Sequence, residues 1–224
     1  MEPRPARSPM SERVLKTVRT STLERLLDTA AKLFWTKGYA STTTRELAEV
    51  LGVRKASLYH HINNKEDLLF KISLISLERI IHDVQCAVAE LDDPLERVRT
   101  LVHAHVKSMI ANRDKHSVML TEFRALSPVR NGRIVALRDE YERLVTSVLA
   151  DACAAGVLRA DIPVKYLRLS LLNLLNWSIF WFELEGELSP ERLADYLTTI
   201  YLAGAQTSAA SLRPGTESGA DLTH

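Results

Sequence analysis

Cysteine, glycine and proline are all scarce in this chain of 224 residues. The two cysteines, Cys86 and Cys153, cannot build a disulfide framework and lack the spacing of a zinc site, which favours a reducing compartment. We therefore expect a cytoplasmic protein that holds no metal and no cofactor. Eight glycines and eight prolines leave long uninterrupted stretches rich in Leu, Ala, Arg and Glu, and such stretches favour helix.

Long apolar runs are missing as well. Residues 1–21 lack the apolar core of a secretory signal. The most apolar stretch, residues 167–184, is interrupted by Ser170, Asn173, Asn176, Ser178 and Glu183. A buried helix explains this stretch better than a membrane span, so we expect no contact with a membrane.

The signatures of an enzyme are also missing. The chain has seven histidines, but His103 and His105 are two positions apart on a predicted helix and so point to different faces. No Ser-His-Asp order, phosphate-binding glycine loop or pair of metal ligands stands out. We therefore expect that the protein is not an enzyme.

Positive charge gathers at the start of the chain, although the net charge is only +1. Residues 1–70 carry 12 Lys and Arg against 8 Asp and Glu, whereas the remainder carries 17 against 20. This distribution is expected if the N-terminal end meets a polyanion.

Apolar spacing is helical nearly throughout, so the sequence predicts an all-α fold. A first helix ends near Gly38, and two short helices surround Gly52. Longer helices are predicted near residues 65–91, 94–112, 115–126, 129–155, 163–185 and 190–207. The predicted organisation is a disordered basic arm (1–21), a unit of short helices (22–68), a longer helical domain (69–207) and a disordered tail (208–224).

The most informative stretch runs from Thr42 to Leu69, TTTRELAEVLGVRKASLYHHINNKEDLL. Thr43 or Thr44 can cap a first short helix, and the small Ala48 lets a second helix cross closely above it. Gly52 gives the backbone freedom that the turn between the helices needs. The second helix then presents cationic and hydroxyl side chains outward, which suits entry into a major groove of DNA.

This stretch resembles the TetR family of bacterial regulators. The shared residues run in order and without gaps: Gly38-Tyr39, Thr42-Thr43, Leu47-Ala48, Gly52-Val53, Ser57-Leu58-Tyr59, His61, Lys65-Glu66 and Leu68-Leu69. Ile62 departs mildly from the family, which usually has Phe there. The resemblance implies a three-helix, helix-turn-helix DNA-binding domain over residues 22–68, followed by a helical effector-binding and dimerisation domain over residues 69–207.

The resemblance also implies roles for single residues. Four residues are expected to contact phosphates and fix the register on double-stranded operator DNA: Thr43, Thr44, Tyr59 and Lys65. Five are expected at base edges, where Arg and Lys donate to guanine and Ser bonds several bases: Arg45, Arg54, Lys55, Ser57 and His60. A solvated surface charge is the alternative at each charged position. His61 is expected to pack between helices.

The second half is expected to sense a small hydrophobic effector. The helix predicted at 163–185 is apolar on nearly every face, which predicts burial on all sides. The resemblance implies that this helix and the helix at 190–207 pair with their copies in a two-fold homodimer. Aromatic faces next to amides suit a ligand with one polar end, so the predicted pocket residues are Asn173, Asn176, Trp177 and Trp181. Further candidates are His103, Met109, Met119, Phe123 and Tyr141, and for all of these core or interface packing is the alternative.

Residues 173–190 are similar to TetR-like regulators of fatty-acid and sterol breakdown, which sense acyl-CoA thioesters. This likeness favours an acyl-CoA effector for a dimeric repressor that binds a palindromic operator. The alternative is a DNA-binding protein that responds to no effector.

Overall fold

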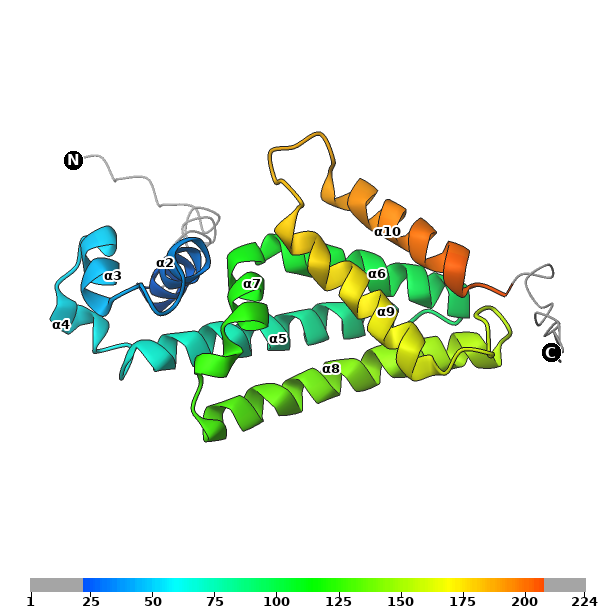
Figure 1. The fold of residues 1–224 in the computed structure, drawn as a ribbon, viewed down its shortest axis with the longest axis horizontal. Coiled ribbons are helices and arrows are strands. Elements are labelled where there is room, and N and C mark those ends of the chain that lie inside the picture. The colour runs from blue at the N-terminus through cyan, green and yellow to red at the C-terminus, as the bar shows by residue number, and fades with distance from the viewer. Residues whose placement is uncertain (1–21, 208–224) are drawn as a thin grey trace, which may run out of the picture.

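Three helices gather at one end of the computed structural model, which describes residues 22–207 (Figure 1). They are α2 (Thr22–Lys37), α3 (Thr44–Leu51) and α4 (Lys55–Leu58). The predicted arm, residues 1–21, and the predicted tail, residues 208–224, lie outside the described residues. From residue 22 to residue 207, the only extended pairing is an isolated antiparallel bridge between Leu158 and Gln206. The all-α prediction is confirmed.

Helix α3 begins and ends at residues whose chemistry favours a helix boundary. Thr43 has extended backbone, and its Oγ1 accepts a hydrogen bond of 3.2 Å from the Glu46 N–H, as a capping residue does. Gly52 follows the helix with φ 67° and ψ 29°, the left-handed conformation that glycine adopts without strain. The Val53 N–H then bonds the Ala48 carbonyl at 3.0 Å, which closes the turn toward α4.

Helix α5 (Lys65–Val88) begins beside this unit and runs through the middle of the remaining helices (Figure 1). It packs against α6 (Pro94–Ala111), α7 (Arg113–Thr121) and α8 (Pro128–Ala154), with a 3-10 turn at Phe123–Ala125. Helix α9 (Val164–Trp177) lies on α8, and α10 (Pro190–Ala205) lies on α6. The order of helices is as predicted, and α5 ends at Val88 rather than Leu91.

The prediction for the helix at 163–185 is wrong in its length, and its burial on all sides stays a prediction for the dimer. Helix α9 ends at Trp177, because the Ser178 hydroxyl donates to the Leu175 carbonyl at 2.6 Å and a 3-10 turn follows over Ser178–Phe180. Only one stripe of α9 is buried in the protomer, namely Leu167, Leu171 and Leu175. Its other face carries the exposed side chains of Tyr166 and Leu169.

Two histidines lie in the core, where charge is costly. Burial lowers the pKa of His105 to about 3 and that of His116 to about 4. His105 Nδ1 lies 2.6 Å from the Tyr141 hydroxyl, and burial raises the pKa of that phenol. All three side chains are therefore neutral near pH 7.

We expect the protein to lose stability as the pH falls from about 6.5 toward 4. Since the folded-state pKa values of His105 and His116 lie below the ordinary 6.5, the unfolded chain binds more protons in this window. Between pH 7.5 and 5, this difference lowers the free energy of unfolding by roughly 2 kcal/mol per buried histidine. Urea unfolding at several pH values measures it, and His116→Gln should flatten the curve. Parallel curves for wild type and variant would contradict the assignment.

Candidate nucleic-acid interface and cavity

All five side chains predicted to reach base edges are exposed: Arg45 on α3, Arg54 directly before α4, Lys55 and Ser57 on α4, and His60 after it. Helix α4 has only four residues, and the buried side chains of Leu58 and Ile62 hold it against the unit's core. Arg45 is engaged in an ion pair with Glu49 at 3.0 Å. Arg54 and Lys55 form no ion pair within residues 22–207, so their charges face solvent and are available to a polyanion.

Hydroxyl groups flank this surface. The Thr44 hydroxyl lies 3.4 Å from the Tyr59 hydroxyl, and the Tyr59 side chain is exposed. Thr43 accepts its capping bond through Oγ1, which leaves its O–H proton free to donate. These three side chains are placed where donation to phosphate oxygens is possible, and their contact with DNA stays a prediction.

Lys65 does not fit the phosphate contact expected of it. Its Nζ donates to three backbone carbonyls, of Tyr39 at 2.9 Å, Ala40 at 3.3 Å and Thr42 at 3.0 Å. The ammonium also lies 4.3 Å from the centre of the Tyr39 ring. Because an ammonium has only three donors, all of them are used inside the protein. Lys65 therefore fastens the first turn of α5 to the segment before α3.

A cavity of about 230 Å³ lies between α5, α6, α7, α8 and α9. Four of the predicted pocket residues line it: Met119, Tyr141, Asn173 and Asn176. Three others lie elsewhere, since Met109 is buried outside the lining, Phe123 packs under Arg138, and His103 pairs with Asp195 at 3.2 Å. Ligand contact by any of these residues stays a prediction.

Trp177 and Trp181 are not among the residues that line this cavity, contrary to the sequence prediction. Their side chains are 67% and 51% exposed. Trp177 lies past the last buried turn of α9, and its ring packs 4.8 Å from the ring of Phe180. Phe180 also lies 5.7 Å from Trp35 of α2, so this aromatic cluster belongs to the surface and to the junction with the N-terminal unit.

Sequence reasoning missed four polar residues of the cavity: His105, His116, Arg138 and Glu142. His105 had a recognisable signal, because it occupies a position on the apolar stripe of α6 that is otherwise filled by Leu101, Val102 and Met109. The His116 ring is held at both nitrogens, with Ser76 Oγ at 3.3 Å from Nδ1 and Asn176 Oδ1 at 3.3 Å from Nε2.

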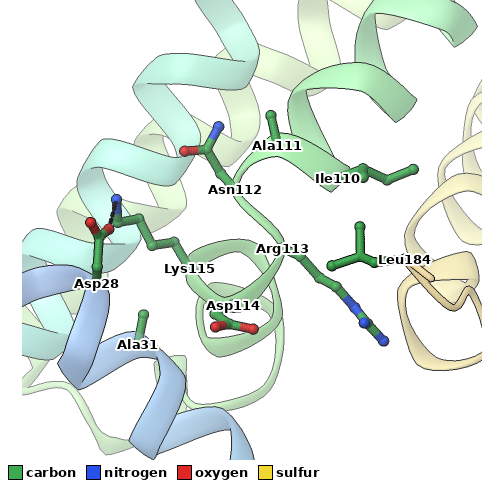
Figure 2. Close-up of a pocket in the computed structure, with 9 residues that line it drawn as sticks. All are labelled: Asp28, Ala31, Ile110, Ala111, Asn112, Arg113, Asp114, Lys115 and Leu184. Atoms are coloured by element: carbon green, nitrogen blue, oxygen red, sulfur yellow. Dashed lines mark ion pairs between the residues drawn. The ribbon is translucent and has the colours of Figure 1, made fainter. Parts of the chain in front are cut away.

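A second pocket, of about 260 Å³, lies where α2 meets the turn between α6 and α7. Figure 2 shows Lys115 reaching across to Asp28 of α2, with which it forms an ion pair of 2.5 Å. Arg113 donates to the Ile179 carbonyl at 3.2 Å, which connects α7 to the turn after α9. The Lys115–Asp28 pair thus joins the N-terminal unit to the bundle, whereas the Arg113 bond lies within the bundle.

Residues 22–207 contain no group of three or more His, Cys, Asp or Glu side chains that could hold a metal ion. Across the same residues, no helix is both long enough and apolar enough to cross a lipid bilayer.

Two family models match the chain. The model described as bacterial regulatory proteins of the tetR family matches residues 26–72, and the model described as the tetracyclin repressor-like C-terminal domain matches residues 91–205. These matches correspond to the N-terminal unit with the start of α5, and to the bundle from α6 to α10.

Known proteins are similar over most of the chain. The HTH-type transcriptional repressor KstR2 of Mycolicibacterium smegmatis is 25% identical over 186 residues, which are 83% of this chain and 91% of that repressor. The crystal structure of the TetR family transcriptional regulator PfmR from Thermus thermophilus is 35% identical with a TM-score of 0.75, covering 80% of this chain and 97% of PfmR. AibR, in complex with isovaleryl coenzyme A and operator DNA, is 27% identical with a TM-score of 0.72, covering 80% of this chain and 97% of AibR. The chain belongs to the TetR family of bacterial transcriptional regulators.

Proposed function

We propose that this protein is an effector-responsive repressor, which binds a palindromic operator as a homodimer and releases it when an acyl compound fills the cavity. The course of α5 is the observation that carries the proposal. Its first turn is fastened to the N-terminal unit through Lys65, while Leu77 and Ile80, farther along the same helix, line the cavity. A ligand that prefers one tilt of α5 thereby changes the placement of the DNA-binding surface.

We propose that the exposed cationic side chains of α3 and α4 contact base edges of the operator and so determine sequence preference. Replacing Arg54 or Lys55 by Ala should lower affinity for an operator selected from random DNA by about 1–3 kcal/mol, because a donor to a base edge is lost. Fluorescence anisotropy with the operator and a scrambled duplex measures the loss. Arg143→Ala on α8 is a control that also removes an exposed arginine.

Lys65→Met should act differently, since it removes bonds inside the protein. We expect faster amide hydrogen exchange over residues 39–68 and a lower fraction of protein that can bind the operator. For the protein that still binds, the dependence of operator affinity on salt concentration should be unchanged. If hydrogen exchange stays normal while the salt dependence of operator affinity becomes shallower, Lys65 contacts phosphate after all.

If Arg54→Ala and Lys55→Ala both bind the operator as tightly as wild type, this surface does not contact base edges.

The proposed dimer surface is formed by the outer faces of α9 and α10. Large apolar side chains are exposed there in the protomer, and they include Tyr166 at 56%, Tyr196 at 48% and Ile200 at 60%. Exposed large apolar side chains on two helices that contact each other support a protein–protein contact at this place. A two-fold pairing through these helices also agrees with a palindromic operator, because protein symmetry is mirrored in the half-sites.

Ile200→Asp should therefore give a folded monomer, because the new carboxylate is solvated in the protomer but unpaired in the dimer. Leu197→Asp, one turn earlier, should instead unfold the protomer, since Leu197 is only 3% exposed. Sedimentation velocity at micromolar concentration and circular dichroism separate the two effects. Val135→Asp, at an exposed apolar position on α8, should stay dimeric. An Ile200→Asp protein that remains a dimer would place the interface elsewhere.

The effector is proposed to be an acyl compound such as an acyl-CoA thioester. The complex of AibR with isovaleryl coenzyme A and operator DNA is an example among similar proteins. A cavity of about 230 Å³ is smaller than most ligand pockets, so only a short acyl group would be enclosed while a coenzyme moiety stays outside.

Titration of acyl-CoA thioesters into the operator complex tests this response. Operator affinity should fall roughly 5- to 150-fold. Leu172→Trp fills the cavity and should keep operator binding while abolishing release, whereas Leu184→Trp, outside the cavity, should respond as wild type. Release that is equal in both variants would place the effector elsewhere. If no acyl compound releases DNA, the protein acts without an effector of this class.

A further inference from the structure

One nitrogen in the cavity wall has no hydrogen-bond partner. His105 is completely buried and lines the cavity, and its Nε2 is unpaired in the described structure. Buried polar atoms are nearly always paired, and an unpaired one is unfavourable. The neighbouring His116 differs, because both of its ring nitrogens are engaged by Ser76 and Asn176.

The partners of the two rings determine where their protons lie. Asn176 Oδ1 can only accept, so His116 Nε2 carries the proton and its Nδ1 accepts from the Ser76 hydroxyl. His105 Nδ1 faces the Tyr141 hydroxyl at 2.6 Å. The Tyr141 hydroxyl has no other hydrogen-bond partner in the described residues, so its proton is satisfied only if the phenol donates to Nδ1. His105 therefore keeps its proton on Nε2, and this N–H is a donor that needs an acceptor.

Two charged side chains, Arg138 and Glu142, lie in the same wall. The Arg138 guanidinium donates to the Met119 carbonyl at 2.9 Å and lies 4.2 Å from the centre of the Phe123 ring. Arg138 forms no ion pair in the described part of the chain, since Glu142, one turn later on α8, pairs with Arg168 at 2.8 Å. Burial lowers the pKa of Arg138, and the nearby carboxylate of Glu142 offsets part of this effect. Arg138 also lowers the pKa of His116, which places its charge near the buried polar side chains.

Apolar side chains line the remaining wall together with the amides of Asn173 and Asn176, and they include Leu77, Ile80, Leu120 and Leu172. An occupant that fits has a small apolar body, at least one oxygen that accepts a hydrogen bond, and negative charge at that end. Amines and other cations are disfavoured, because Arg138 repels them, Glu142 is already paired with Arg168, and the His105 N–H needs an acceptor.

We propose that the effector site selects a small organic acid, whose carboxylate accepts from His105 Nε2–H and lies beside Arg138. This inference rests on the proposed function and specifies the chemistry of its effector. A thioester carbonyl supplies the same acceptor oxygen without the local charge, so free acids and thioesters are the two sources that an experiment has to separate. The cavity volume of about 230 Å³ limits the acid to a short chain or a single ring.

Calorimetry with the full-length dimer tests the selection directly. The probes are hexanoate and benzoate, the matching amides hexanamide and benzamide, hexanol, and hexanoyl-coenzyme A. The acids should bind roughly 10- to 100-fold more tightly than the amides and the alcohol, since only they pair with the buried charge. Operator release is measured in parallel with the same probes.

Single substitutions test whether His105 and Arg138 cause the preference for acids over amides. His105→Phe should weaken acid binding about 10- to 100-fold, and His105→Gln, which keeps a donor, should restore part of it. Arg138→Met should remove the discrimination between acid and amide, and Arg138→Lys should retain it. His103→Phe and Arg133→Met are matched controls at exposed or partly exposed positions of the same helices.

A second test uses the wild-type protein, because His105→Phe also leaves the Tyr141 hydroxyl unpaired. The ¹⁵N spectrum of the imidazole rings should show the Nε2–H tautomer for both buried histidines.

The outcomes are separable. Binding of acids that depends on His105 and Arg138, with Nε2–H tautomers, supports the inference. Release of operator by hexanoyl-coenzyme A alone, with unchanged binding in the His105 and Arg138 variants, overturns the inference and leaves the proposed function standing. Equal affinity for acid and amide, or an Nδ1–H tautomer at His105, also overturns it. Failure of every probe to bind or to release DNA overturns both the inference and the acyl-responsive repressor.

Discussion

The first turn of α5 connects the two halves of the molecule through three consecutive side chains. Lys65 donates to carbonyls of the N-terminal unit, whereas Glu66 accepts from the Ser127 N–H at 2.9 Å and Asp67 pairs with Arg130 at 3.2 Å. Ser127 and Arg130 lie at the start of α8, so the same turn is held from both sides. Carbonyls and carboxylates of this kind are strong acceptors, and their geometry is directional. The position of the DNA-binding surface relative to the bundle depends on this turn.

The cavity persists because polar contacts hold its walls. Apolar side chains around an empty space tend to relax into it, which reduces the cost of the space. Here His116 is fixed by Ser76 and Asn176, and His105 is fixed by Tyr141, so the rings cannot turn inward without losing hydrogen bonds. A network of this kind gives a defined shape at the expense of stability. That balance is typical of a site built for an occupant.

Much of the fold was predictable from local chemistry, because helix boundaries in this chain are set by residues near them. Thr43 and Gly52 delimit α3 as the sequence predicts, and the order of the later helices follows from apolar spacing. Apolar spacing does not distinguish a side chain buried in its own protomer from one exposed on its surface. This is why Trp177 and Trp181 were predicted in a cavity and are found outside it.

Two site features depend on contacts between distant residues, which a single sequence does not reveal. Lys65 bonds carbonyls more than twenty positions earlier in the chain, so a charge expected to meet phosphate is used within the protein. Arg138 and His105 come together only because α6 and α8 pack side by side in the bundle. For His105 the one local sign is a polar residue on an apolar stripe.

The contacts of α2 with the bundle restrict the motion that is open to the N-terminal unit. This unit is attached at the first turn of α5, and again where Lys115 pairs with Asp28 and Phe180 packs against Trp35. Helix α2 also packs along α7 and against α5, so the unit rests on the bundle over an extended contact and not at a single joint. The unit can therefore reorient only if α5 or α7 shifts with it. In a two-fold pair, symmetry repeats that shift in the other protomer, so the spacing of both DNA-binding surfaces changes at once.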